Sequence, residues 1–196
     1  MEIEILLYEG FDELDAIGPY EVFRTAAEAG GDLAASLVTR EPTERITASH
    51  GLRVEPDGEL GEPDLLVVPG GGWGSRNQRG TWGEYERNEI PPLLAQRYDR
   101  GTTLASVCTG AMLLERAGLL DGRPAVTHAS ALSDLRETDA EVIEARVVDT
   151  GALLTAGGVT SGIDLALWLV EREIGEELAG TVATTLEYER DEVYRS

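Results

Sequence analysis

The stretch that decides the fold is T-T-L-A-S-V-C-T-G-A-M-L-L-E-R-A-G at residues 102–118. Its first half is an apolar run too short for a stable helix, and its second half has helical spacing from Ala111 onward. The stretch therefore predicts a strand that passes directly into a helix, with Cys108 at the turn. Gly110 allows the tight turn, as in the G-x-S-x-G pattern of a nucleophile elbow, which presents a side chain above the sheet edge.

The same alternation of strand and helix extends along the chain. Short apolar runs predict strands at residues 3–8, 33–39, 65–68, 102–107, 125–127, 145–148 and 152–155. Helical spacing appears at 19–29, 91–98, 111–117, 161–173 and 176–185, and Pro19 and Pro91 suit first helical turns. This order predicts an α/β fold, a largely parallel sheet with helices on both faces and with sites at the carboxyl ends of its strands.

The 196 residues suit one domain, and no linker or repeat divides them. We expect a single domain over residues 1–186 and an acidic C-terminal tail over 187–196, either solvated or a frayed helix. The first ten residues lack a basic leader, and no apolar run approaches the roughly 20 residues that span a bilayer. The sequence therefore predicts a cytoplasmic protein with no membrane partner.

The charge balance is strongly acidic. The chain has 37 acidic and 16 basic residues, all of the latter arginine, for a formal net charge of −21. Such a surface repels nucleic acid and anionic lipid, which excludes both as partners. The absence of lysine favours a halophilic protein adapted to molar salt, where charge repulsion is screened; a merely acidic mesophilic protein is the alternative.

Cys108 is the only cysteine, so the chain forms no internal disulfide. At a strand-to-helix turn its thiol faces the positive end of a helix, which predicts a pKa below the free value of about 8.5. The sequence therefore indicates a nucleophile, with a buried structural cysteine as the alternative.

A second segment, D-L-L-V-V-P-G-G-G-W at residues 64–73, ends a buried strand in three glycines. The N–H groups of Gly71 and Gly72, with the amide of Thr109, are candidate oxyanion-hole donors. An ordinary loop that needs positive φ angles is the alternative. The polar run at residues 75–80 suits a mobile loop over the site.

Acidic residues also lie near the expected sheet edge. Asp12, Glu13 and Asp15 precede a helix, where they either cap it and favour its dipole or contribute to chemistry. If the first strand is central, Asp15 reaches the sulfur of Cys108. Two such groups share a proton and titrate as a unit.

The two histidines are less informative. His128 follows a predicted strand and is either a base or a structural residue bonded to its neighbours Thr127 and Ser130, whereas His50 lies in a polar loop and is expected to be solvated. With one cysteine and two histidines the chain shows no zinc cluster, and it has neither a P-loop nor a G-x-G-x-x-G after a strand. We therefore expect no metal and no cofactor.

Taken together, these motifs resemble the DJ-1/PfpI superfamily over most of the chain. The matching segments are L-D-A-I-G-P-Y-E-V-F at 14–23, V-P-G-G at 68–71, S-V-C-T-G at 106–110 and T-H at 127–128. With G-G-V-T-S-G-I-D-L-A-L at 157–167, the pattern resembles the branch of isonitrile hydratases and of the amidotransferase-like sensor domains in AraC-type regulators. The resemblance implies a flavodoxin-like sandwich, usually a homodimer.

The resemblance also implies roles for individual residues. Cys108 matches the nucleophile, Asp15 the acidic residue that hydrogen-bonds it, and Gly71 with Thr109 the oxyanion donors. Members described as intracellular proteases carry histidine directly after the cysteine, where this chain has Thr109, so a protease is disfavoured unless His128 supplies the base.

The function expected from the resemblance is hydration of a small isonitrile to an N-substituted formamide, with Cys108 as nucleophile and Asp15 as proton carrier. A non-catalytic redox or ligand sensor that uses Cys108 is the alternative from another class. Glyoxalase or deglycase activity would use the same residues.

Overall fold

The computed structural model describes residues 1–196. Its main sheet has eight strands in the order β12-β10-β11-β7-β6-β1-β2-β5, and every neighbouring pair is parallel except β10 and β11. These strands are β1 (Glu2–Leu7), β2 (Ala34–Thr39), β5 (Gly58–Glu59), β6 (Leu65–Val68), β7 (Thr103–Val107), β10 (Val147–Asp149), β11 (Leu153–Ala156) and β12 (Val193–Arg195). Two small pairs lie outside it: β3 (Ile46–Thr47) with β4 (Arg53–Val54), and β8 (Pro124–Ala125) with β9 (Glu141–Val142).

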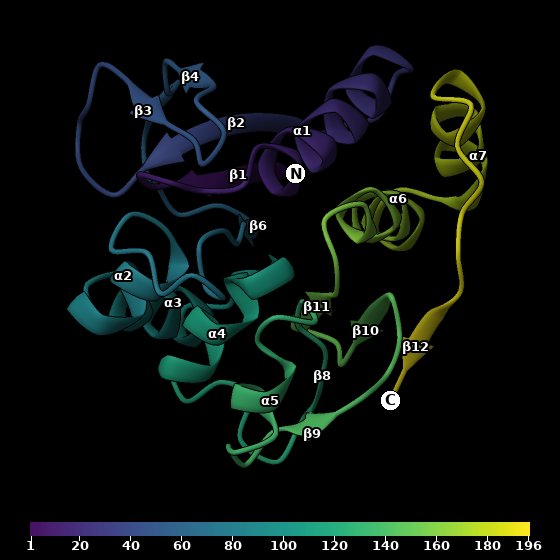
Figure 1. Cartoon of the computed structure of the whole chain (residues 1–196). Helices are drawn as coiled ribbons and strands as arrows, with labels where there is room; N and C mark the ends of the chain where they lie inside the picture. The colour runs from purple at the N-terminus through teal and green to yellow at the C-terminus, as the bar shows by residue number, and fades with distance from the viewer.

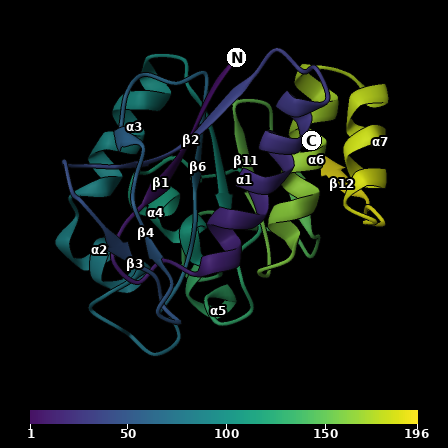
Figure 2. The same cartoon turned by 90° about the horizontal axis from the view of Figure 1, so that it is seen from above.

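Helices cover both faces of this sheet. Figure 1 and Figure 2 show α1, α6 and α7 together on one side, and α2, α3 and α4 on the other. The bounds are α1 (Glu13–Glu28), α2 (Thr81–Arg87), α3 (Ile90–Asp99), α4 (Ala111–Arg116), α5 (Leu132–Leu135), α6 (Ser161–Glu173) and α7 (Glu176–Thr185). The predicted α/β fold, a largely parallel sheet between two helical layers, is confirmed.

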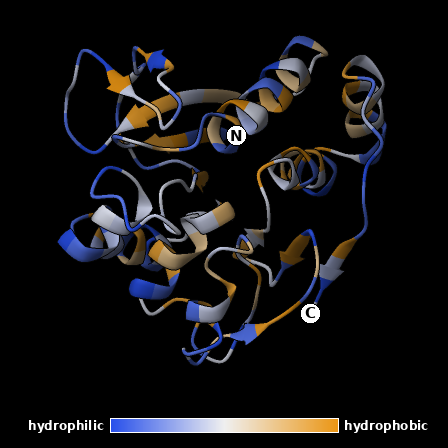
Figure 3. Cartoon of the chain, viewed as in Figure 1, coloured by the Kyte–Doolittle hydropathy of each residue, from blue (hydrophilic) through white to orange (hydrophobic).

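The hydrophobic core lies against the central strands. All residues of β6 and β11 are buried, as expected for strands covered on both faces. Figure 3 shows apolar colour concentrated on the strands and inner helix faces, with polar colour on loops and helix ends. Central strands of this kind form a rigid base for side chains at their carboxyl ends.

The strand register places the segments after β1, β6 and β7 side by side at one edge of the sheet. Val68 pairs with Ser106, and Ile5 pairs with Val67. Extending these registers by two or three residues sets Tyr8, Gly70 and Cys108 side by side at the carboxyl edge of the sheet. The candidate segments therefore meet where parallel sheets carry their sites.

The first helix differs from its prediction. It begins at Glu13 because the Asp12 carboxylate caps it, accepting a hydrogen bond from the Leu14 N–H at 3.3 Å. Pro19 therefore lies inside α1 rather than in its first turn. Pro91, by contrast, does lie in the first turn of its helix.

Two further segments differ from expectation. Residues 81–87 form α2, which the sequence hides because its glycine and scattered polar residues break the apolar spacing. The segment at 187–196, expected as a solvated tail or frayed helix, instead ends in β12, which pairs with β10 and extends the sheet.

No helix has both the length and the apolar content that crossing a bilayer demands.

We expect the stability of this fold to rise with salt. The net charge of −21 imposes self-repulsion on the compact state, and the Debye length falls to about 3 Å at 1 M salt. Thermal unfolding followed by circular dichroism in 0.1 M and then molar potassium chloride measures this. A melting temperature that stays flat or falls would contradict halophilic adaptation.

Candidate active site

Cys108 occupies a strained turn between β7 and α4. It starts a short 3₁₀ turn, Cys108–Gly110, and has φ +59°, a left-handed conformation that costs a non-glycine residue on the order of 1–3 kcal/mol. Thr127 Oγ1 donates to the Cys108 carbonyl oxygen at 2.9 Å and fixes this backbone from the segment after β8. The predicted nucleophile elbow is thus present in the structure, with a side chain that is 5% exposed.

Two glycines let the elbow and the loop after β6 touch. A Cβ on Gly110 would fall 2.2 Å from the Val68 carbonyl oxygen, and one on Gly70 would fall 2.5 Å from the Thr109 nitrogen. Both distances are too short for any side chain, so these positions require glycine. This close approach brings the backbone of the Pro-Gly-Gly segment against the turn that carries the thiol.

Asp15 comes to the same place from the first turn of α1. It is fully buried, and its Oδ2 accepts a hydrogen bond from the Gly70 N–H at 3.0 Å, whereas its Oδ1 has no hydrogen-bond partner. Burial, then the negative charge of Asp12, raises the pKa of Asp15 to about 8, against the opposing effects of the Gly70 N–H and of the nearby Cys108 thiol. Asp15 is thus an acid that stays protonated at neutral pH.

The pKa of Cys108 shifts opposite to the prediction. Burial raises it most, the nearby Asp15 raises it further, and the interaction with the Thr109 N–H lowers it by less. The prediction of a depressed thiol pKa is therefore wrong, because it weighed the helix terminus but not the removal of the sulfur from water.

Cys108 and Asp15 consequently titrate together. Asp15 raises the pKa of Cys108, whereas the Cys108 thiol lowers the pKa of Asp15 by less than burial raises it, so the pair holds two protons at neutral pH and one proton above a pH of about 8. Because the raised pKa of the thiol lies above that of Asp15, most of the singly protonated state is a thiol beside a carboxylate, and its minor form is a thiolate beside a carboxylic acid. That form combines a nucleophile with a proton donor.

The expected oxyanion donors are only partly free. The Gly71 N–H already donates to Thr109 Oγ1 at 3.0 Å, so it is not the open donor that the sequence suggested. The N–H of Gly72 has no protein acceptor, and that of Thr109 faces the sulfur. Gly71 and Gly72 have φ angles of +129° and +73°, as the loop alternative required.

His128 is hydrogen-bonded to its neighbour Ser130, as in the structural alternative to a catalytic base. Its Nδ1 accepts from the Ser130 N–H at 3.1 Å and lies 2.8 Å from Ser130 Oγ. No hydrogen bond joins it to Cys108 or Asp15, so the structure does not present it as their base.

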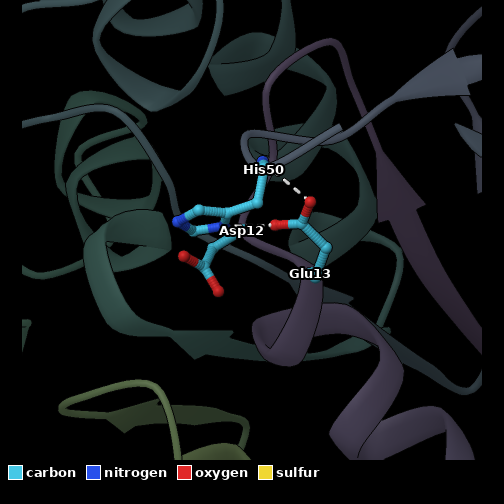
Figure 4. Close-up of side chains that lie close together, drawn as sticks. All are labelled: Asp12, Glu13 and His50. Atoms are coloured by element: carbon cyan, nitrogen blue, oxygen red, sulfur yellow. Dashed lines mark hydrogen bonds and ion pairs between the residues drawn. The ribbon is translucent and has the colours of Figure 1, made fainter. Parts of the chain in front are cut away.

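His50 is exposed, as expected, but it is ion-paired. Figure 4 shows it beside Asp12 and Glu13, whose possible ligand atoms all lie within 4.8 Å of one another. Burial raises the pKa of Glu13, but bonds from the His50 ring and from backbone N–H groups outweigh it and lower that pKa to about 2. The carboxylate also accepts from Ser49 Oγ, so its contacts fix the loop at residues 49–52 to the start of α1.

The loop at residues 75–80, expected to be mobile, is held in place by side-chain contacts. The Arg76 guanidinium lies 3.9 Å from the Trp82 ring centre and forms an ion pair with Asp134 at 3.0 Å. Trp73 donates to the same carboxylate at 2.5 Å. These contacts hold the loop between α2 and α5.

Two buried hydroxyl groups at the site were not predicted from the sequence. Tyr8 follows β1, and Thr81 begins α2; the latter is fully buried and lies 3.1 Å from Thr109 Oγ1. Nothing in the sequence marks Thr81, because the helix it starts was not predicted. Tyr8 had a signal, since it ends a strand that reaches the same sheet edge.

Comparisons with known proteins agree with this geometry. The DJ-1/PfpI family model matches residues 1–172. The chain is 32% identical over 191 residues to an isonitrile hydratase from Pseudomonas putida, covering 96% of this chain and 78% of that protein. It is also 32% identical over 188 residues to the HTH-type transcriptional regulator CdhR from Pseudomonas aeruginosa, covering 91% of this chain but about half (52%) of the regulator.

A solved structure shows the same fold. A ThiJ/PfpI family protein from Pseudomonas syringae superposes with a TM-score of 0.82 at 27% sequence identity, over 97% of this chain and 76% of that one. With an elbow cysteine, a buried carboxyl beside it and a family match that spans most of its length, this chain belongs to the DJ-1/PfpI family.

Proposed function

We propose that this protein is a cysteine-dependent hydratase that converts a small isonitrile to an N-substituted formamide. The observation that carries the proposal is the buried Cys108–Asp15 pair, in which Asp15 Oδ1 has no protein partner. A neutral carboxylic acid beside a thiol suits a neutral electrophile that must gain a proton as sulfur attacks it. Similarity to the isonitrile hydratase from P. putida supports this substrate class.

The first step forms a thioimidate from the singly protonated pair. The Cys108 thiolate attacks the terminal isonitrile carbon and forms a C–S bond, and the Asp15 proton passes to the same carbon. Asp15 ends this step ionised. Because the Gly70 N–H occupies Oδ2, Oδ1 is the oxygen that carries the proton. A terminal carbon without substituents suits a cysteine residue that is only 5% exposed.

The second step releases the product. Water attacks the thioimidate carbon, Asp15 takes one water proton, and that proton passes to the substrate nitrogen. The C–S bond then breaks, the hydroxyl proton returns to Asp15, and the formamide leaves. Water is the only co-reactant, and the pair regains its thiolate and its carboxylic acid.

Incubation of the purified protein with cyclohexyl isocyanide in high salt tests this function. We expect the isonitrile to disappear as N-cyclohexylformamide forms, followed by chromatography and mass spectrometry. Methylglyoxal is the parallel substrate, because glyoxalase chemistry would use the same cysteine. Turnover of methylglyoxal alone would replace the proposed substrate class.

A non-catalytic sensor is the second candidate. The observation that favours it is the similarity to the regulator CdhR, of which this chain matches about half. Under this proposal Cys108 reports oxidation or ligand binding and turns over neither substrate. Absence of product from both substrates would favour the sensor over the enzyme.

A further inference from the structure

Three buried hydroxyl groups form a continuous hydrogen-bonded chain beside the thiol. Tyr8 Oη lies 2.5 Å from the Pro69 carbonyl oxygen and 2.9 Å from Thr81 Oγ1, which in turn lies 3.1 Å from Thr109 Oγ1. Tyr8, Thr81 and Thr109 are 5%, 0% and 2% exposed. We refer to these three residues as the hydroxyl chain; it connects the end of β1, the start of α2 and the elbow.

The direction of every bond in the hydroxyl chain follows from its last acceptor. A carbonyl oxygen only accepts, so Tyr8 must donate its single proton to Pro69. Tyr8 then accepts from Thr81, whose own proton is thereby used. Thr81 can therefore only accept from Thr109, so the Thr109 proton points toward Thr81.

Thr109 Oγ1 also forms a hydrogen bond with the loop after β6. The Gly71 N–H donates to it at 3.0 Å. With its proton committed to Thr81, the hydroxyl has no hydrogen left to donate, and what remains is a lone pair. The same oxygen lies 2.6 Å from the point where a Cβ on Gly70 would fall, and Asp15 Oδ2 lies 3.0 Å from that point. The oxygen is therefore close to the Asp15 carboxyl, and it belongs to the residue that follows Cys108.

We propose that Tyr8 and Thr81 are positioning residues, which hold the Thr109 proton away from the Cys108–Asp15 pair so that Thr109 Oγ1 acts at the site only as an acceptor. This role rests on the proposed hydratase function. The attacking water brings O–H bonds and the substrate nitrogen gains an N–H, so an acceptor serves the second step. A donor at this place would instead hydrogen-bond the oxygen of the attacking water and lower its nucleophilicity, and before the substrate binds it would hydrogen-bond the thiolate.

Isosteric substitutions test the hydroxyl chain. Thr81→Val removes the acceptor of the Thr109 proton. Tyr8→Phe removes the acceptor of the Thr81 proton, which can then be donated to Thr109 Oγ1, the remaining partner of Thr81. Both changes free the Thr109 proton from Thr81. We expect each to lower kcat for cyclohexyl isocyanide about tenfold with KM within about twofold, an effect that acts on the transition state rather than on ground-state binding. The double variant should be no slower than Thr81→Val, and Thr81→Ser should retain wild-type kcat.

A second readout does not depend on the substrate. We expect iodoacetamide to alkylate Cys108 at pH 9 at least about threefold faster in Thr81→Val than in the wild type, because a released hydroxyl hydrogen-bonds the thiolate and raises the thiolate fraction by more than it lowers the nucleophilicity of the sulfur. Thr81→Ser should react at the wild-type rate. Thr102→Val is the matched control, because it removes another buried threonine hydroxyl, which donates to the Pro63 carbonyl oxygen at 2.9 Å away from the site.

The outcomes separate the two proposals. Wild-type protein that leaves the isonitrile unchanged would refute the hydratase function, and the alkylation rates would still decide the hydroxyl chain. If Thr81→Val alkylates at the wild-type rate or more slowly, or behaves like Thr102→Val in both readouts, the positioning role is wrong. A Thr81→Ser variant as impaired as Thr81→Val would also overturn it, since that result indicates packing of the methyl group.

Discussion

Cys108→Ala is expected to abolish formation of N-cyclohexylformamide from cyclohexyl isocyanide and to leave the fold intact. The expected loss is complete because no other cysteine exists and the C–S bond is the first bond formed. Product formation and the intact mass of the protein after rapid acid quenching are measured together. Wild-type protein should show a fraction with the mass of the substrate added, and the variant should show none.

Cys108→Ser is the matched control for packing, because it keeps the shape of the side chain at the strained φ of +59°. We expect it to be as inactive as the alanine variant, since a buried hydroxyl is a far weaker nucleophile than a thiolate. If either variant kept more than about one hundredth of wild-type turnover, covalent catalysis by this residue would be refuted.

Asp15→Asn is expected to have the second largest effect, and it acts in opposite directions on activity and stability. Asparagine keeps the size of the side chain and an oxygen for the Gly70 N–H, but it cannot carry a proton. Loss of general acid–base catalysis predicts a fall in kcat/KM of about 10²–10⁴. Steady-state assays of the variant in high salt measure this.

The stability change follows from the raised pKa of Asp15. The unfolded carboxyl has a pKa of about 3.9, and the folded one has a pKa of about 8, so the folded state binds the proton more tightly. Wild-type stability therefore falls as pH rises from about 4 to 8, and each unit of the pKa difference corresponds to about 1.4 kcal/mol. Asparagine avoids this cost, so the variant should unfold at a higher temperature than wild type at pH 8.

Asp12→Asn is the control for Asp15→Asn. Asparagine caps helices as well as aspartate does, so α1 is preserved while one charge near the pair is removed. This variant should stay active within a few-fold. An Asp15→Asn protein that is fully active, or less stable than wild type at pH 8, would contradict the role of a buried proton carrier.

The sequence predicted the framework of this protein because its framework signals are local. The bounds of α6 and α7 agree with the apolar spacing over 161–173 and 176–185, and the turn at Cys108 needed only a strand, a glycine and a helix in series. The start of α1 was misplaced because proline is common in first turns, whereas here the cap at Asp12 decides where the helix begins.

The pKa shift of Cys108 and the hydroxyl chain could not be predicted from the sequence, for a physical reason. Whether Cys108 gains or loses its proton more easily depends on how far it is removed from water and on the carboxyl from α1, neither of which a local pattern encodes. Thr81 reaches Thr109 only through the packing of α2, held by Trp73, Trp82 and Tyr85 against one another. Contacts between distant segments require the folded structure.

The pH dependence of kcat/KM for cyclohexyl isocyanide tests the central claim most directly, because it measures the protonation state in which Cys108 and Asp15 act. The reactive pair holds one proton, so activity should be low at neutral pH, rise tenfold per pH unit below the midpoint, reach half its maximum near pH 8 and stay level above it. A profile that is flat or falls between pH 6 and about 9, with turnover otherwise intact, would contradict catalysis by this pair.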